Sequence, residues 1–234
     1  MKDLIEKLNA KTLREVVATL GLPCADKRQL VTLREAVAAA GPSLGVLEAL
    51  GLGVSGTKVA QVAPRLRDST ASARPVFVAL DFETANRSRD SACAISVVRV
   101  EDGRIVKTYS KLIQPPVLDF EFTYIHGISA RDVRNAPTYR EIHGEILEQM
   151  CGAQFIAAHN ASFDLSVMNA VCRRWNLTPP KLPWQCTVKM ARNTWSIFPT
   201  KLPDVCNHLG IALKHHDATS DATACARIVL AAHK

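Results

Sequence analysis

The sequence predicts an α/β domain that follows a smaller, all-helical N-terminal domain. Three observations lead to this prediction. Residues 76–80 form an unbroken apolar run, which is typical of a strand buried on both faces. From there to about residue 232, strand-like segments are interspersed with segments whose apolar residues recur at helical spacing. Residues 1–67 show short helical patterns alone.

The length and composition are those of a globular protein. The chain has 234 residues, 47% of them hydrophobic, which is enough for one large domain or for a medium domain with a small companion. Its first residues mix charged and apolar positions without the core of a signal peptide, and no stretch is long and apolar enough to span a bilayer. We therefore expect a soluble, cytoplasmic protein without a membrane partner.

The cysteines and the net charge indicate the redox compartment of the protein and the kind of partner it binds. The seven cysteines are dispersed and form no CxxC pair, so we expect small core residues in a reducing compartment rather than disulfides or zinc ligands. The net charge of +7 divides into 11 minus 7 for residues 1–74 and 18 minus 15 for residues 75–234. This basic balance is compatible with a polyanionic partner.

Two runs of apolar residues at helical spacing predict helices in the N-terminal region. A glycine follows the first run and Gly-Pro follows the second, as expected where helices end. The runs are Leu13, Val16, Val17 and Leu20 before Gly21, and Leu30, Leu33 and Val37 before Gly41.

A faint repeat within this region relates residues 20–28 to residues 50–58. The second copy resembles the turn and second helix of SAP-type DNA-binding hairpins, although Pro64 falls where that helix should continue. Two interpretations stay open: the region binds nucleic acid, through lysines such as Lys27 and Lys58, or it binds a protein partner. Small and polar residues that end in Pro75 then predict a linker at 71–75, between domains at 1–70 and 76–234.

Three strands are predicted at the start of the second domain, over residues 76–84, 92–100 and 105–113. A Glu-Asp-Gly turn at 101–103 joins the last two into an antiparallel meander. An apolar patch at 124–128 then lies in a loop and is followed by a helix over 139–150 and a short strand over 154–158.

The first strand carries two carboxylates at its end. Residues two apart in a strand point the same way, so Asp81 and Glu83 lie on one face. Two such charges are costly at the end of a buried strand unless a cation lies between them, which predicts a metal site. The alternative is a surface turn with two solvated side chains.

A second acidic motif, residues 159–164, follows the strand at 154–158. The helix behind it carries apolar residues at 163, 167, 171 and 175, which places Asp164 in its first turn beside the buried face. Asn160 or Ser162 is the expected cap. A simple complement to the helix dipole is the alternative role for Asp164.

A third motif, residues 215–221, precedes a last helix that runs to about residue 232 and that Asp217 is expected to cap. Asp221 shares an apolar face with Cys225 and Ile228, so a cation or another partner is expected beside it. His216 lies on a loop that reaches the same site, and we expect the preceding His215 to be solvated.

In order, spacing and context, these three motifs resemble those of the DEDDh family of 3′–5′ exonucleases, especially bacterial members such as the proofreading epsilon subunit of DNA polymerase III. The resemblance covers about residues 75–232. It implies an RNase H-like α/β fold with a mixed five-stranded sheet flanked by helices. It also implies removal of nucleoside 5′-monophosphates from the 3′ end of a nucleic acid.

The resemblance also implies roles for individual residues. Two divalent ions about 3.5–4 Å apart, Mg²⁺ or Mn²⁺, would be held by carboxylates and would serve phosphodiester hydrolysis. Asp81 would bridge the ions, Glu83 and Asp221 would hold the ion on the nucleophile side, and Asp164 would act on the other. His216 is the expected general base.

The resemblance further implies a nucleotide pocket. Its candidate residues are Phe82, Thr84, His126 and Asn160, with a core position as the alternative for Phe82. His159 is expected to be a structural hydrogen-bonding residue.

Several functional questions stay open at this stage. DNA with a free 3′ end is favoured as substrate, an RNA-trimming activity is the alternative within the family, and a catalytically silent nucleic-acid-binding adaptor is the alternative outside it. The chain ends at Lys234, directly after the last motif helix, whereas the epsilon subunit carries a further polymerase-binding segment. We therefore expect a stand-alone nuclease, or one attached through its N-terminal domain.

Overall fold

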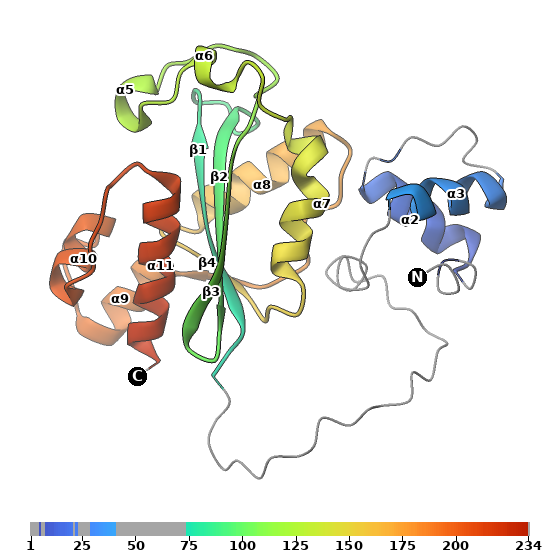
Figure 1. Cartoon of the computed structure of the whole chain (residues 1–234). Helices are drawn as coiled ribbons and strands as arrows, with labels where there is room; N and C mark the ends of the chain where they lie inside the picture. Colours follow the sequence, from blue (N-terminus) through green and yellow to red (C-terminus); the bar gives the residue numbers. More distant parts are fainter. Residues whose placement is uncertain (1–4, 6–7, 21, 23–28, 41–73, 234) are drawn as a thin grey trace, which may run out of the picture.

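A computed structural model describes residues 5, 8–20, 22, 29–40 and 74–233. The α/β part is built on one five-stranded mixed sheet in the order β3-β2-β1-β4-β5 (Figure 1). Strands β1 (Phe77–Thr84), β2 (Ala92–Glu101) and β3 (Arg104–Leu112) pair antiparallel. Strands β4 (Ile156–Ala158) and β5 (Trp184–Cys186) run parallel to β1. The predicted meander and mixed sheet are confirmed.

The turn between β2 and β3 lies where the sequence predicted it. Asp102 and Gly103 have φ values of 49° and 75°, a left-handed pair that suits the twist of a two-residue hairpin. β3 forms one edge of the sheet, and most of its side chains are exposed.

Helices cover both faces of the sheet, and the two-residue period of β1 decides which side chain faces which helix. Val78, Leu80 and Phe82 join the core under α7 (Tyr139–Met150) and α8 (Ser162–Arg174). Phe77 and Ala79 face the other way, toward α11 (Ala218–Ala232). α9 (Thr187–Trp195) and α10 (Leu202–Leu209) pack beside α11 on that second side (Figure 1).

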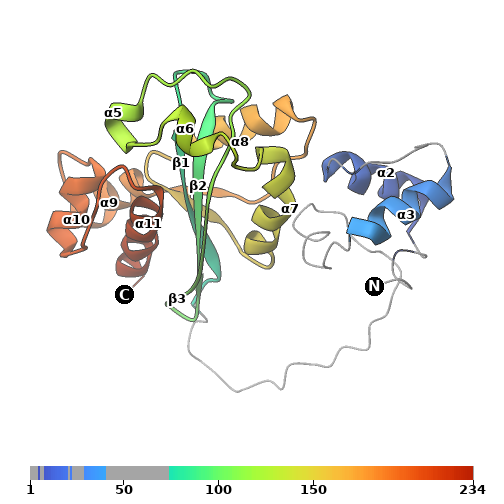
Figure 2. The ribbon, with the colours of Figure 1, turned by 45° about the horizontal axis from the view of Figure 1, so that its top comes forward.

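Two single-turn helices lie near the last residue of β1, Thr84, and the first residue of β2, Ala92 (Figures 1 and 2). They are α5 (Thr123–His126) and α6 (Ala130–Val133). The loop expected at residues 124–128 therefore begins as one turn of helix, which is too short to give a periodic pattern.

The predicted cap of α8 is wrong. Ala161 occupies the N-cap position, and no side chain caps the helix there. Asn160 has a φ of 61°, so the chain turns sharply between β4 and α8, and Ser162 is already the first helical residue. The predicted cap of α11 is confirmed, because the Asp217 carboxylate accepts hydrogen bonds from the N–H groups of Thr219 and Ser220.

The described N-terminal residues include α2 (Ala10–Thr19) and α3 (Leu30–Ala40), at the positions that the two helical runs predicted. Leu13, Val16, Val17, Leu33 and Val37 are buried together in one small core. The SAP-like second copy, Pro64 and the first part of the linker lie outside the described residues. None of the helices in the described parts of the chain has the length and hydropathy needed to cross a membrane.

Candidate active site

The carboxylates of the first and third motifs meet on the α11 side of β1. Asp81 and Glu83 project from β1 toward α11, where Asp221 stands in the first turn of the helix. One carboxylate oxygen from each of these three residues lies within 4.8 Å of the others. Asp81 and Asp221 are 140 positions apart in the sequence. They meet because alternate residues of β1 point toward the helix that packs across the strand.

Asp164 reaches the same end of the sheet from the neighbouring strand. β4 is parallel to β1, so the carboxyl ends of both strands lie at one edge, where open α/β sheets commonly bind their ligands. α8 begins there, and its Asp164 is 2% exposed. The Oδ1 atom of Asp164 accepts a hydrogen bond of 3.1 Å from the N–H of Phe82, which ties the helix to β1. Asp164 does not belong to the group within 4.8 Å.

Burial and mutual repulsion raise the pKa values of these acids. The pKa of Asp81 lies well above its usual value because of burial and then the charges of Asp164, Glu83 and Asp221. Burial first, and then Asp221 and Asp164, raise the pKa of Glu83 to about 8. Burial also raises the pKa of Asp164 to about 8, against the hydrogen bond from Phe82. Without a counter-ion, this cluster of carboxylates is an electrostatically costly arrangement.

A divalent cation fits this cluster. The Oδ1 atom of Asp221 is buried and has no hydrogen-bond partner, so a strong acceptor faces the cluster unsatisfied. Convergent carboxylate oxygens are the hard ligands that Mg²⁺ and Mn²⁺ prefer. The donor set therefore suits the divalent-metal dependence that exonucleases of this family have.

We expect the metal-free protein to lose stability as the pH rises from about 6.5 to about 8.5. The pKa values of Glu83 and Asp164 are raised in the folded state, so their contribution is full at low pH and is lost as the pH rises through about 8. His143 and His159, whose pKa values burial lowers to about 4, change stability only below about 6.5.

The check is the Tm measured in EDTA across this pH range, with and without excess Mg²⁺. We expect Mg²⁺ to remove most of the decline, because the cation replaces the proton as counter-charge. The variant Glu83→Gln should show a shallower decline in EDTA than the natural chain. A Tm that is flat or rising in EDTA would contradict the carboxylate assignment.

Both histidines of the third motif lie beside Asp221, but they contact it differently. The Nδ1–H of His215 donates to Oδ2 of Asp221 at 3.0 Å, and the backbone N–H of His216 donates to the same oxygen at 3.1 Å. The two rings stack at 3.8 Å. His215 is thus not merely solvated, as the sequence suggested, although its side chain is 38% exposed.

His216 holds a conformation that is uncommon for a side chain with a Cβ. Its φ is 66°, in the left-handed region, and such strain is found most often at functional sites. Burial and then the neighbouring His215 lower its pKa, against the charge of Asp221. The lowered pKa favours the neutral ring, which is the form able to accept a proton.

The predicted nucleotide-pocket residues differ in their exposure. Phe82 is 3% exposed and packs in the core on the face opposite Asp81, so the core alternative describes its side chain. Thr84 is also buried, and its carbonyl accepts a hydrogen bond of 3.1 Å from Nε2 of His126. Asn160 is exposed and lines the cleft that contains Asp81 and Asp221.

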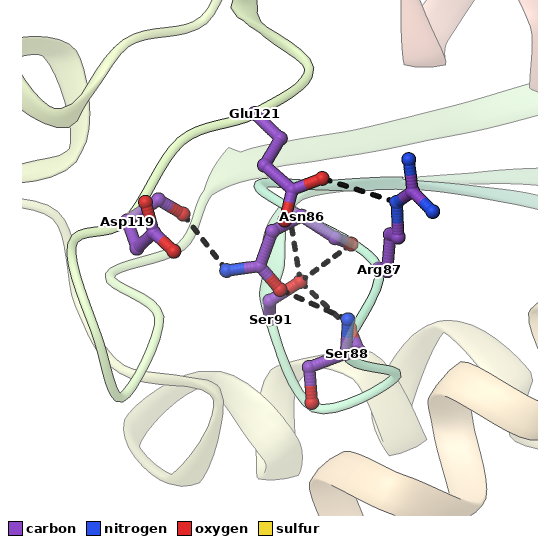
Figure 3. Close-up of polar contacts among 6 residues, drawn as sticks. All are labelled: Asn86, Arg87, Ser88, Ser91, Asp119 and Glu121. Atoms are coloured by element: carbon purple, nitrogen blue, oxygen red, sulfur yellow. Dashed lines mark hydrogen bonds and ion pairs between the residues drawn. The ribbon is translucent and has the colours of Figure 1, made fainter.

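Hydrogen bonds fix the loop that follows β1 and carries the chain away from the carboxylates (Figure 3). The side chain of Asn86 donates to the carbonyl of Asp119 at 2.8 Å, and Arg87 pairs with Glu121 at 3.2 Å. Ser91 closes the loop through its hydroxyl, which donates to the carbonyl of Ser88 at 2.7 Å. These contacts join the loop after β1 to the segment at 119–121.

His159 connects the second motif to a loop that sequence reasoning did not single out. Its Nε2–H donates to the carbonyl of Thr200 at 3.1 Å, so its Nδ1 accepts from the hydroxyl of Thr187 at 2.8 Å. The structural role expected for His159 is therefore supported by two hydrogen bonds. The loop that it holds belongs to a wall of the cleft that includes Arg192, Phe198 and Lys201. Residues 196–201 between α9 and α10, Ser-Ile-Phe-Pro-Thr-Lys, mix polar and apolar positions, so no pattern in the sequence marked Phe198.

Comparisons with known proteins identify relatives of this chain. A model of the exonuclease family, RNase_T, matches residues 78–229. The PolC-type DNA polymerase III of Clostridium perfringens (strain 13 / Type A) is 33% identical over 158 residues, which cover 65% of this chain and 11% of the relative. The PolC-type polymerase of Thermotoga petrophila is 28% identical over 185 residues, 76% of this chain and 14% of the relative. The chain thus matches only a small part of the length of these relatives.

Solved structures show the same fold. Exonuclease X in complex with 5′-overhanging duplex DNA superposes with a TM-score of 0.55 at 24% identity, over 67% of this chain and 90% of that chain. The nuclease domain of 3′hExo, a DEDDh family member bound to rAMP, gives a TM-score of 0.60 at 19% identity, with the same coverage. The RNase H-like fold expected from the sequence is thereby confirmed. Together with the family match over residues 78–229, this places the chain in the DEDDh family of 3′–5′ exonucleases, with a domain that resembles the proofreading exonuclease of DNA polymerase III.

Proposed function

We propose that this protein removes nucleoside 5′-monophosphates from the 3′ end of DNA by a two-metal-ion mechanism. The observation that carries the proposal is the convergence of Asp81, Glu83 and Asp221 within 4.8 Å at the carboxyl end of β1. The unpartnered Oδ1 atom of Asp221 supports it, because a buried acceptor without a donor is a ready ligand for a cation.

Each acid has a proposed place in this mechanism. Asp81 would contact both ions, Glu83 and Asp221 would hold the ion on the nucleophile side, and Asp164 would act on the second ion. When bound, two divalent ions activate a water molecule and stabilise the leaving 3′ oxygen. Asp164 is tied to the N–H of Phe82, so its remaining oxygen has a fixed direction.

The proposed general base is His216. Its neutral ring can accept the proton of the attacking water, and its backbone N–H is held by Asp221. His215 is proposed as a positioning residue, because it donates to the same carboxylate oxygen and stacks on the His216 ring. Backbone and side-chain groups of Thr84, His126 and Asn160 are proposed to receive the terminal nucleotide.

DNA is the proposed substrate because the curated relatives are DNA polymerases. RNA is the second candidate, since one solved structure with this fold is described as recognising the 3′ end of a histone mRNA stem-loop. A silent adaptor is disfavoured, because a protein without turnover would have no reason to keep four acids and a histidine in one place.

The test uses DNA and RNA oligonucleotides of one sequence, each labelled at the 5′ end, with Mg²⁺ or Mn²⁺. Stepwise shortening from the 3′ end that is faster on DNA would support the proposal. Faster shortening of RNA would favour RNA as the substrate. No shortening with either metal would contradict the proposed exonuclease activity.

We further propose that the N-terminal domain binds nucleic acid. If Lys27 and Lys58 bind phosphates, deleting residues 1–72 should weaken binding to long oligonucleotides and leave turnover of saturating short ones unchanged. The slope of log affinity against log salt should become shallower by about 0.7 for each single-strand phosphate that the shortened chain no longer binds, or by about 0.9 for each duplex phosphate.

The measurement compares both chains over a salt series, each with Asp81→Ala to stop cleavage. A domain that binds a protein partner instead predicts parallel slopes and equal affinities, and that result would exclude the nucleic-acid interpretation.

A further inference from the structure

The cleft at the carboxylate cluster also contains residues of different chemistry. It has a volume of about 540 Å³. Asp81 and Asp221 line it, and so do Phe198, Lys201 and Arg192. Acidic, aromatic and cationic side chains therefore border one continuous space.

Phe198 is the least covered large hydrophobic residue in the described parts of the chain. Its side chain is 86% exposed, although a phenylalanine ring is among the groups that most favour burial. A single exposed apolar residue is common on a protein surface, but this ring lines the same cleft as Asp81 and Asp221, where a substrate would contact it.

The loop that carries Phe198 is anchored, so the ring stands at a defined place. Thr200 is 6% exposed, and its carbonyl accepts from Nε2 of His159 at 3.1 Å. Its hydroxyl accepts from Nε of Arg192 at 2.7 Å. Since His159 directly follows β4, the loop at Thr200, two residues after Phe198, is tied to the strand that precedes Asp164.

The cations that line this cleft point to an anionic partner. Arg192 and Lys201 are both exposed, and the carboxylates that line the same cleft would be neutralised by the proposed metal ions. A protruding aromatic ring next to exposed cations is the combination with which proteins hold unpaired nucleic-acid strands, the ring stacking on a base and the cations contacting phosphates.

We propose that Phe198 stacks on an unpaired base of the substrate strand and that Lys201 contacts the backbone of that strand. This inference rests on the proposed function and adds to it two residues that bind the substrate strand. In duplex DNA the faces of the bases are already stacked on one another, so the ring is available only to a base that has left the helix.

Binding is the first test. A fluorescently labelled oligothymidylate is titrated with protein that carries Asp81→Ala, and the titration is repeated with Phe198→Ala added to that background. We expect the affinity to fall about 5- to 150-fold, the effect of removing the stacking of one base. Phe198→Trp should retain the affinity, and Val106→Ala, at an exposed apolar residue on β3 that does not line the cleft, should leave it unchanged. Equal affinity for the Phe198→Ala protein would overturn the proposal.

A second measurement locates the stacked base. Oligonucleotides with one abasic site at successive positions from the 3′ end are compared on both proteins. If Phe198 stacks on one base, removing that base should weaken binding to the parent protein and have no further effect on the Phe198→Ala protein. The same loss of affinity in both proteins at every position would exclude the stacking interaction.

A third measurement separates this proposal from the proposed function. With Asp81 intact, Phe198→Ala should raise KM on oligonucleotides and leave kcat close to that of the natural chain, because the ring contacts a base and not the reacting atoms. A fall in kcat with an unchanged KM would overturn the stacking role. A natural chain inactive on oligonucleotides would contradict the proposed function, and the binding titration would still decide the role of Phe198.

Discussion

Asp81→Ala is expected to reduce cleavage below detection while the protein stays folded. Asp81 is the proposed ligand of both ions, so its removal affects the activation of water and the stabilisation of the leaving oxygen together. It also removes one of the charges that repel Glu83, Asp164 and Asp221. We therefore expect a metal-free Tm equal to or above that of the natural chain.

The measurement pairs cleavage of a labelled oligonucleotide in Mg²⁺ or Mn²⁺ with thermal unfolding in EDTA. Glu148→Ala serves as the matched control, because Glu148 is an exposed acid on α7, away from the cluster. The control should keep both activity and Tm. Substantial cleavage by a contaminant-free Asp81→Ala protein would refute the assignment of Asp81, and a lowered metal-free Tm would refute the repulsion argument.

His216→Ala is expected to lower the rate of hydrolysis by about 10²- to 10⁴-fold, the usual contribution of a positioned general base. Metal binding should be retained, because the carboxylates are untouched. His215→Ala should have the smaller effect. It removes one hydrogen bond to Asp221, while the backbone N–H of His216 still donates to the same oxygen.

Single-turnover rates across pH, together with Mn²⁺ titration by the rise in Tm, test this ranking. Loss of the general base should abolish the acidic limb of the pH–rate profile. A larger fall in rate for His215→Ala than for His216→Ala would exchange the two roles. In that case His215 would act through its 3.0 Å hydrogen bond to Asp221.

The sequence predicted the parts of the fold whose patterns are long and regular. β1, the β2–β3 hairpin, α7, α8 and α11 all have several residues of one periodicity, and each lies where that periodicity placed it. β5 has three residues of intermediate burial, and α5 and α6 have four residues each. Elements this short take their conformation from the neighbours that they pair with or pack on, and no local pattern marks them.

The candidate site also contains features that the sequence predicts and features that it does not. Asp81, Glu83 and Asp221 could be placed on inward faces from spacing alone, and the structure brings their oxygen atoms together. The hydrogen bond of His215 to Asp221 depends on the left-handed turn at His216, which side-chain pattern cannot predict. Phe198 was missed because its importance lies in exposure and in what it faces, and both are properties of the folded chain.

The hydrogen bonds of His159 affect how inactive sequence variants of this enzyme should be interpreted. His159 stands in the motif that holds Asp164, yet its ring supports the loop that carries Thr200 and Phe198. A screen for inactive variants would group His159 with the proposed metal ligands, because replacing either kind of residue lowers nuclease activity. Activity alone therefore does not distinguish residues that take part in the chemistry from residues that support the loop beside the cleft.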